Sequence, residues 1–130
     1  MTTLRARTAY TIAALAGATG WLAITQLTQR REAWDSGLYF SWFLPSIALV
    51  LLGLGFFAPA RAWRWAFAPF AAQAAVAFVQ NPTANLLPIG LVVFAFYGAV
   101  CMLPAWIGST LRRRLVAPPP PAALRRGGTG

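Results

Sequence analysis

Long stretches without a charged residue divide this chain. Charges are absent from residues 8–29, 36–60 and 65–111. A helix rises about 1.5 Å per residue, so it needs about 20 apolar residues to cross the hydrocarbon core of a membrane. The first two stretches allow one crossing each, and the third allows two because a polar, proline-containing turn at 80–85 interrupts it. The pattern predicts four transmembrane helices, at about residues 8–27, 38–58, 62–80 and 88–110.

Two prolines, Pro45 and Pro69, fall inside predicted helices. Proline has no backbone N–H, and its ring collides with the carbonyl four residues earlier. Membrane helices tolerate this when neighbouring groups satisfy the freed carbonyl. We therefore expect a kink in the second helix and another in the third.

Composition also indicates a membrane protein. The chain has 130 residues, of which 58% are hydrophobic and 10% are charged. A soluble domain carries about 25% charged residues, so this chain lacks the polar surface that water requires. Eleven basic residues, all arginines, face two acidic ones, which gives a net charge of +9. Proteins that bind nucleic acid are basic and polar rather than basic and apolar, so we expect no nucleic-acid partner.

The same composition leaves little catalytic chemistry. The chain has no histidine and a single cysteine, Cys101, so an internal disulfide and a cysteine-rich metal site are both excluded. Glu32 and Asp35 are the only acidic side chains. No phosphate-binding loop and no nucleophile elbow occurs. We expect a protein that is not an enzyme and binds no cofactor.

The arginines predict an orientation. With four crossings, the N-terminal tail, the second loop and the C-terminal tail share one side and carry two, two and five arginines, whereas the other side carries only Arg30 and Arg31. Positively charged segments stay in the cytoplasm, so both termini are expected there. Arg112, Arg113 and Arg114 follow the fourth predicted span directly and are expected to contact anionic lipid headgroups.

The two ends of the chain differ from its centre. Residues 1–116 are expected to form one four-helix transmembrane domain, and 117–130 a disordered cytoplasmic tail rich in proline and arginine. A PxxP docking site in that tail is the alternative. Near the N-terminus, Ala14-Leu15-Ala16 fits a signal-peptide cleavage site, but the hydrophobic run continues past Trp21, which favours a retained helix.

The first predicted helix has a face of small residues. Ala9, Ala13, Gly17 and Gly20 gather on one side of a helical wheel. Small residues let the backbone of a second membrane helix approach closely. We therefore expect this face to be a helix-packing surface.

Gln73 is the one strongly polar side chain well inside a predicted span. An unpaired amide in hydrocarbon is unfavourable, so Gln73 must face protein or water. We prefer an interhelical hydrogen bond, either to Thr19 or to a carbonyl freed near Pro69. The alternative is a contact with a substrate or an ion.

The predicted outer loops contain the remaining polar chemistry. An anion site there would use arginines from the first outer loop and amides from the second. The competing interpretation, which we favour, is that the acidic residues neutralise the arginines locally and that Asp35 caps a helix. The candidate residues of this outer-loop site are Arg30, Arg31, Glu32, Trp34, Asp35, Asn81 and Asn85.

The central part of the chain contains the short motifs Trp34-Asp35-Ser36, Tyr39, Pro45, Asn81-Pro82, Asn85-Leu86-Leu87-Pro88 and Gly90. In these motifs the chain resembles a group of small bacterial inner-membrane proteins with four predicted transmembrane helices. The resemblance covers roughly residues 30–110. It implies a four-span fold in the inner membrane of a bacterium, and it implies no activity and no site residue.

Two functions from different classes remain. The preferred one is a structural or accessory membrane protein that packs against itself or a larger membrane complex, because the chain has small-residue faces and little chemistry. The alternative is a small transporter or channel for an ion or small molecule, suggested by Gln73, Pro45 and Pro69. Proton-coupled exporters of the small multidrug type carry a carboxylate in their first helix, and here that helix has none.

Overall fold

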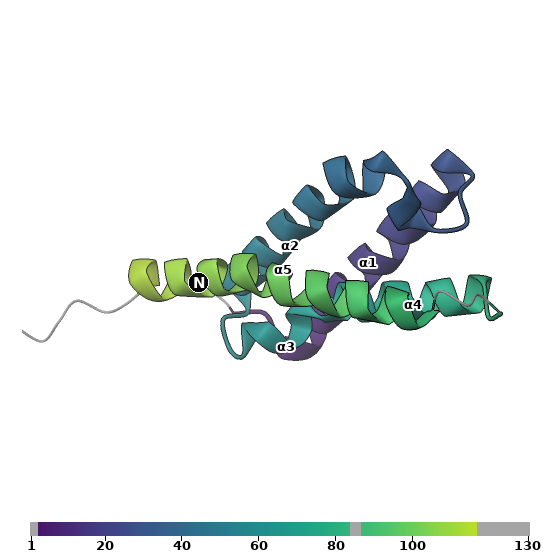
Figure 1. Cartoon of the computed structure of the whole chain (residues 1–130). Coiled ribbons are helices and arrows are strands. Elements are labelled where there is room, and N and C mark those ends of the chain that lie inside the picture. The colour runs from purple at the N-terminus through teal and green to yellow at the C-terminus, as the bar shows by residue number, and fades with distance from the viewer. Residues whose placement is uncertain (1–2, 84–86, 117–130) are drawn as a thin grey trace, which may run out of the picture.

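The computed structural model describes residues 3–83 and 87–116, and over these residues every regular element of secondary structure is a helix. Figure 1 shows α5 running the length of the molecule, with α2, α3 and α4 against it. A 3₁₀ turn, Ala33–Asp35, lies in the loop after α1, and a π-helical turn, Tyr39–Phe43, leads directly into α2. The α-helices are α1 (Ala6–Thr28), α2 (Leu44–Phe57), α3 (Ala62–Ala66), α4 (Ala68–Gln80) and α5 (Leu87–Val116). The predicted tail over 117–130 lies outside the described residues.

Within residues 3–83 and 87–116, three helical segments are long and apolar enough to cross a membrane. They are Ala6–Thr28, Tyr39–Phe57 and Pro88–Val116. They correspond to the first, second and fourth helices that the sequence predicts. The chain is therefore a helical, multi-pass membrane protein.

The third predicted helix is not continuous, which corrects the prediction for residues 62–80. α3 ends at Ala66 after five residues, and α4 begins at Ala68 and contains thirteen. The break precedes Pro69, whose missing N–H and bulky ring are incompatible with a regular helical bond to the carbonyl of Trp65. The kink that the sequence predicts here is thus a break that divides the segment into two shorter helices.

Pro45 is accommodated differently, by a wider turn before it. The N–H of Leu44 donates to the carbonyl of Tyr39, five residues earlier, so the chain forms a π-helical turn over Tyr39–Phe43. Pro45 cannot donate the bond that would continue an ordinary α-helix through this turn. The segment remains helical from Tyr39 to Phe57.

The last helix is longer than predicted and changes the role of one arginine. α5 continues to Val116 rather than ending near residue 110. Arg112 is buried, and its guanidinium donates to the carbonyl of Phe56 at 3.0 Å and lies 5.8 Å from that ring. A cation is favourable at the C-terminal end of α2, where backbone carbonyls have no helical partner. The expectation that Arg112 faces lipid headgroups is therefore wrong, whereas Arg113 and Arg114 are exposed.

The small-residue face of α1 packs inside the chain. Ala9, Ala13 and Gly17 are buried, and a Cβ atom on Gly17 would overlap the backbone of Pro69. Gly20 packs against a different neighbour, because a Cβ atom on Gly20 would overlap the ring of Phe43. Ala9, Ala13 and Gly17 are therefore not exposed for contacts with another chain, whereas Gly20 is half-buried.

A second close helix crossing, between α2 and α5, is the most extensive contact in the described bundle. A Cβ atom on Gly55 would overlap the carbonyl oxygen of Ala105. On the facing helix, a Cβ atom on Gly108 would overlap the carbonyl oxygen of Leu52. Glycine on both helices brings the two backbones together, as small residues do in membrane bundles.

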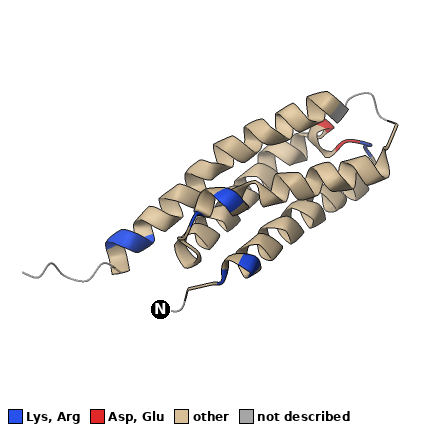
Figure 2. Ribbon diagram, turned by 90° about the horizontal axis from the view of Figure 1, so that it is seen from below, with Lys and Arg blue, Asp and Glu red and all other residues tan. Residues whose placement is uncertain are grey.

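The charged residues lie at the two ends of the bundle (Figure 2). Both acidic residues lie beside Arg30 and Arg31 at one end, and the other described arginines lie toward the opposite end. The backbone N–H of Leu4 donates to the carbonyl of Phe57 at 2.9 Å, which ties the N-terminal segment to the end of α2. The helices between these two ends have apolar outer surfaces, with side chains such as Leu49 and Val79 exposed.

Candidate functional site

The first candidate site is a buried set of hydrogen bonds around Gln73 on α4. The Tyr39 hydroxyl donates to Oε1 of Gln73 at 2.8 Å. Nε2 of Gln73 donates in turn to the carbonyl of Gly17 at 3.4 Å. Gln73 and Tyr39 are both fully buried, so these bonds replace solvation for both side chains. The amide joins α1, α4 and the π-helical turn before α2.

The prediction that Thr19 is the hydrogen-bond partner of Gln73 is wrong. Thr19 is exposed, and its hydroxyl donates to the carbonyl of Leu15 in its own helix at 2.6 Å. Gln73 contacts Gly17, and a position two residues further along a helix is turned by about 200°. Thr19 therefore points away from α4, and an interhelical bond forms with other partners.

Sequence reasoning missed Tyr39 as the partner of Gln73. Tyr39 lies near the expected start of the second helix, where it reads as a residue of the membrane interface. Its hydroxyl still needs a hydrogen-bond partner when the ring is buried. That requirement could have indicated the pairing, because Gln73 is the strongly polar group inside a neighbouring helix. Only the packing of three helices decided the pairing.

An aromatic cluster lies next to these hydrogen bonds. Trp21 on α1 is fully buried and donates from Nε1 to Oε1 of Gln80 at 3.1 Å. Its ring meets Trp34 edge-on at 6.1 Å between centroids, and Trp34 stacks on Phe94 of α5 at 5.4 Å. A Cβ atom on Gly90 would lie 2.6 Å from the Trp34 ring. Trp34 thus anchors the loop after α1 to α5.

The second candidate site is a hollow of about 290 Å³ at the end of the bundle that carries both acidic residues. α1, the loop after it and the end of α4 contribute its walls. Arg30 lies 3.6 Å from the carboxylate of Asp35, with both side chains more than half exposed. Asn81 donates from Nδ2 to the backbone carbonyl of Arg31 at 3.4 Å. The lining residues are Thr25, Gln26, Gln29, Arg30, Arg31, Gln80 and Asn81.

One of the charge pairs expected in this loop is present. Asp35 pairs with Arg30 at the surface, where such pairs contribute at most about 1 kcal/mol. Partial burial raises the pKa of Glu32 above its ordinary value of 4.5, and the negative charge of Asp35 adds to the shift. The expectation that Asp35 caps a helix is wrong, because the cap is Ser36, whose hydroxyl accepts from the N–H of Leu38 at 3.2 Å.

The structure brings together only part of the outer-loop set. Arg30, Arg31 and Asn81 line one hollow, but Trp34 is stacked in the aromatic cluster rather than beside a guanidinium. Asn85 lies outside the described residues. The hollow does not include Gln73, so the two candidate sites are separate.

The fold is that of a small helical membrane protein, in which Gln73 and Tyr39 form buried contacts between the chain's own helices. Comparisons of the chain with protein-family models, with curated proteins and with solved structures find no match.

Proposed function

We propose that this chain is a non-enzymatic integral membrane protein of the bacterial inner membrane, a structural or accessory subunit that packs against itself or a larger membrane complex. The observation that carries the proposal is that Gln73, the polar group deepest among the helices, is hydrogen-bonded within the chain. A transport pathway would need that amide beside water or solute. Its burial between helices instead favours a packing role.

The proposed topology has four crossings with both termini in the cytoplasm. α3 and α4 together would supply the third crossing, since residues 62–80 at about 1.5 Å per residue are nearly as long as the hydrocarbon core is thick. The bonds from Trp21 to Gln80 and from Asn81 to Arg31 support this, because they join the end of α4 to the second half of α1 and to the loop after it. The arginine distribution supports the orientation.

Thiol labelling in intact cells tests this topology. In a Cys101→Ala background, Asp35→Cys and Asn81→Cys should both react with a membrane-impermeant maleimide added outside, and Thr3→Cys should react only after permeabilisation. With three crossings instead of four, the thiols at 35 and 81 would lie on opposite sides. Labelling of only one of them in intact cells would therefore contradict the proposal.

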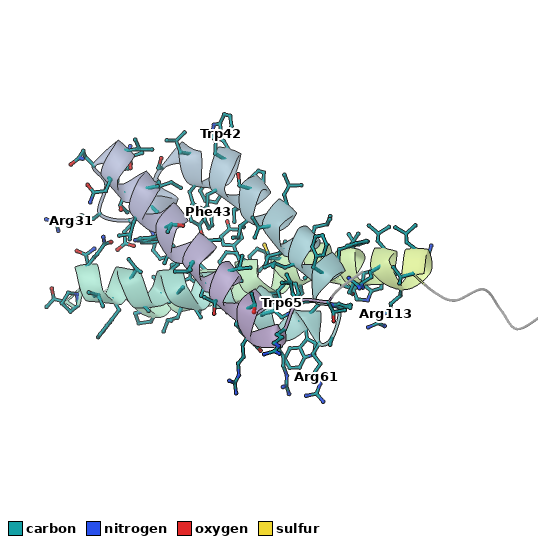
Figure 3. The ribbon with its side chains drawn as sticks, turned by 180° about the vertical axis from the view of Figure 1, so that it is seen from behind. Arg31, Trp42, Phe43, Arg61, Trp65 and Arg113 are labelled. Carbon is teal, nitrogen blue, oxygen red and sulfur yellow. The ribbon has the colours of Figure 1, made fainter. Side chains whose placement is uncertain are left out.

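A groove on the apolar surface is where we expect the proposed association to occur. It lies between α1 and the segment that leads into α2, and its volume is about 380 Å³. Trp42 lines the groove with 70% of its surface exposed, and it points away from the bundle, whereas Phe43 points between the helices (Figure 3). An apolar helix from a second membrane chain would cover this surface. Of the small-residue face of α1, Ala9, Ala13 and Gly17 are already buried within the chain, and only Gly20 lines this groove.

Purification in a mild detergent tests association. We expect the wild-type chain to elute as a defined oligomer or with a defined partner, and Trp42→Ala to reduce that fraction several-fold because it removes the largest exposed side chain of the groove. Leu49→Ala is the matched control, since Leu49 is equally exposed, at 70%, but does not line the groove. A wild-type chain that elutes as a monomer without partners would contradict the proposal.

A further inference from the structure

A second groove, between α3 and α5, lies at the end of the bundle opposite the acidic loop. Its volume is about 380 Å³. We refer to it as the α3–α5 groove. Two arginines and three apolar side chains are among its lining residues: Arg61, Arg113, Trp63, Leu103 and Trp106.

The wall of the α3–α5 groove is apolar and open to the outside. Leu103 and Trp106 on α5 are each about 60% exposed, and Trp63 on α3 is exposed as well. Tryptophan is typical of the zone where lipid headgroups meet acyl chains. The groove therefore lies at the depth where one end of a ligand would be polar and the other apolar.

Two arginines from different elements line the same groove. Arg61 lies at the start of α3, and Arg113 lies in the last turn of α5. Figure 3 shows both at the end of the molecule opposite Arg31. The chain's only acidic side chains, Glu32 and Asp35, lie at that opposite end and cannot neutralise them (Figure 2). A guanidinium pair of this kind is complementary to a phosphate group.

We infer that the α3–α5 groove binds one anionic glycerophospholipid. The phosphate lies between Arg61 and Arg113, and an acyl chain lies against Trp63, Leu103 and Trp106. Basic pockets between membrane helices recognise lipid headgroups in this way. The inference requires membrane insertion but not the association proposed above, so either can fail without the other.

The test measures lipid retained by the full-length protein. The purified chain is titrated in detergent with phosphatidylglycerol or with phosphatidylcholine of the same acyl chains, and bound lipid is counted by native mass spectrometry. We expect one phosphatidylglycerol retained per chain and much weaker retention of phosphatidylcholine. Each arginine near a headgroup contributes about a factor of five in affinity, so Arg61→Gln/Arg113→Gln should weaken binding about 25-fold.

A matched variant separates a specific site from general positive charge. Arg7→Gln/Arg114→Gln removes two exposed arginines at the same end, and neither residue lines the groove. This variant should bind phosphatidylglycerol within about twofold of wild type, since each removed charge is outside the proposed contact. Equal weakening in both double variants would overturn the inference, as would equal retention of the two lipids. Circular dichroism and gel filtration establish that both variants are folded before the titration.

Two further outcomes distinguish the occupant. Soluble glycerol phosphate at the same concentration should not displace the lipid, because it lacks the acyl chain that contacts the apolar wall. Full displacement would mean a site for small anions and would overturn the assignment to a lipid. A second copy of the chain bound through this groove, detected as a dimer lost only in the Arg61→Gln/Arg113→Gln variant, would also overturn it.

Discussion

Gly55→Ala is expected to lower the free energy of unfolding by about 2 kcal/mol or more. The added methyl group would overlap the backbone carbonyl oxygen of Ala105, and a backbone atom cannot move aside as a flexible side chain can. Overpacking of this kind typically costs about 1–3 kcal/mol. Gly108→Ala should have a similar effect, because its Cβ atom would overlap the carbonyl oxygen of Leu52. Unfolding midpoints in mixed micelles with increasing denaturing detergent measure both.

Gly53→Ala provides the control in the same helix. Nothing lies within 4 Å of the position that its Cβ atom would take. Alanine favours helix over glycine by about 1 kcal/mol in water, so this variant should be as stable as wild type or slightly more stable. If Gly53→Ala and Gly55→Ala lose the same stability, the close crossing of α2 and α5 is not what stabilises the bundle.

Gln73→Leu is expected to destabilise the protein by about 1–3 kcal/mol. The substitution leaves the Tyr39 hydroxyl without its acceptor in a buried position, and an unsatisfied buried polar group costs about this much. Tyr39→Phe should be destabilising for the converse reason, since Oε1 of Gln73 then loses its donor. The double variant should lose less than the two single losses together. Hydrogen bonds between membrane helices couple by about 0.6 kcal/mol on average and about 1.7 kcal/mol at most, so the difference should fall in that range.

Thr19→Val is the control for stability, and a flux measurement tests the alternative function. Thr19 is exposed and bonds only to its own helix, so its replacement should leave stability within about 0.5 kcal/mol of wild type. In proteoliposomes, Gln73→Leu should leave the movement of ions and small solutes unchanged. Altered flux from a folded Gln73→Leu protein would favour the transporter or channel over the structural function proposed above.

The sequence predicted the helices that consist of uninterrupted apolar residues, because a membrane imposes a length and a composition that can be read directly. The first, second and fourth spans follow from that rule alone, within a few residues at most ends. The third could be located but not described, because Pro69 predicts a distortion and not whether the helix bends or breaks. The end of α5 was also misplaced, since Arg112 is retained in the helix by a carbonyl on α2 that no local pattern reveals.

The candidate site around Gln73 could also be predicted only in part. That Gln73 needs a partner follows from the cost of an unpaired amide in hydrocarbon, and this requirement is a property of one residue. That the partners are Tyr39 and the carbonyl of Gly17 depends on how three helices rotate about their axes. Thr19, two residues from Gly17, is an equally good hydrogen-bonding group on the wrong side of α1.

The amino-acid sequence by itself determined that this protein is helical and lies in a membrane, because apolar length and the shortage of charge are local properties that add along the chain. Tertiary structure alone decided which glycines bring backbones together and which arginine turns inward. It also decided that Arg61 and Arg113 line one groove. Those outcomes depend on the relative placement of helices distant in sequence, and small differences in packing decide that placement.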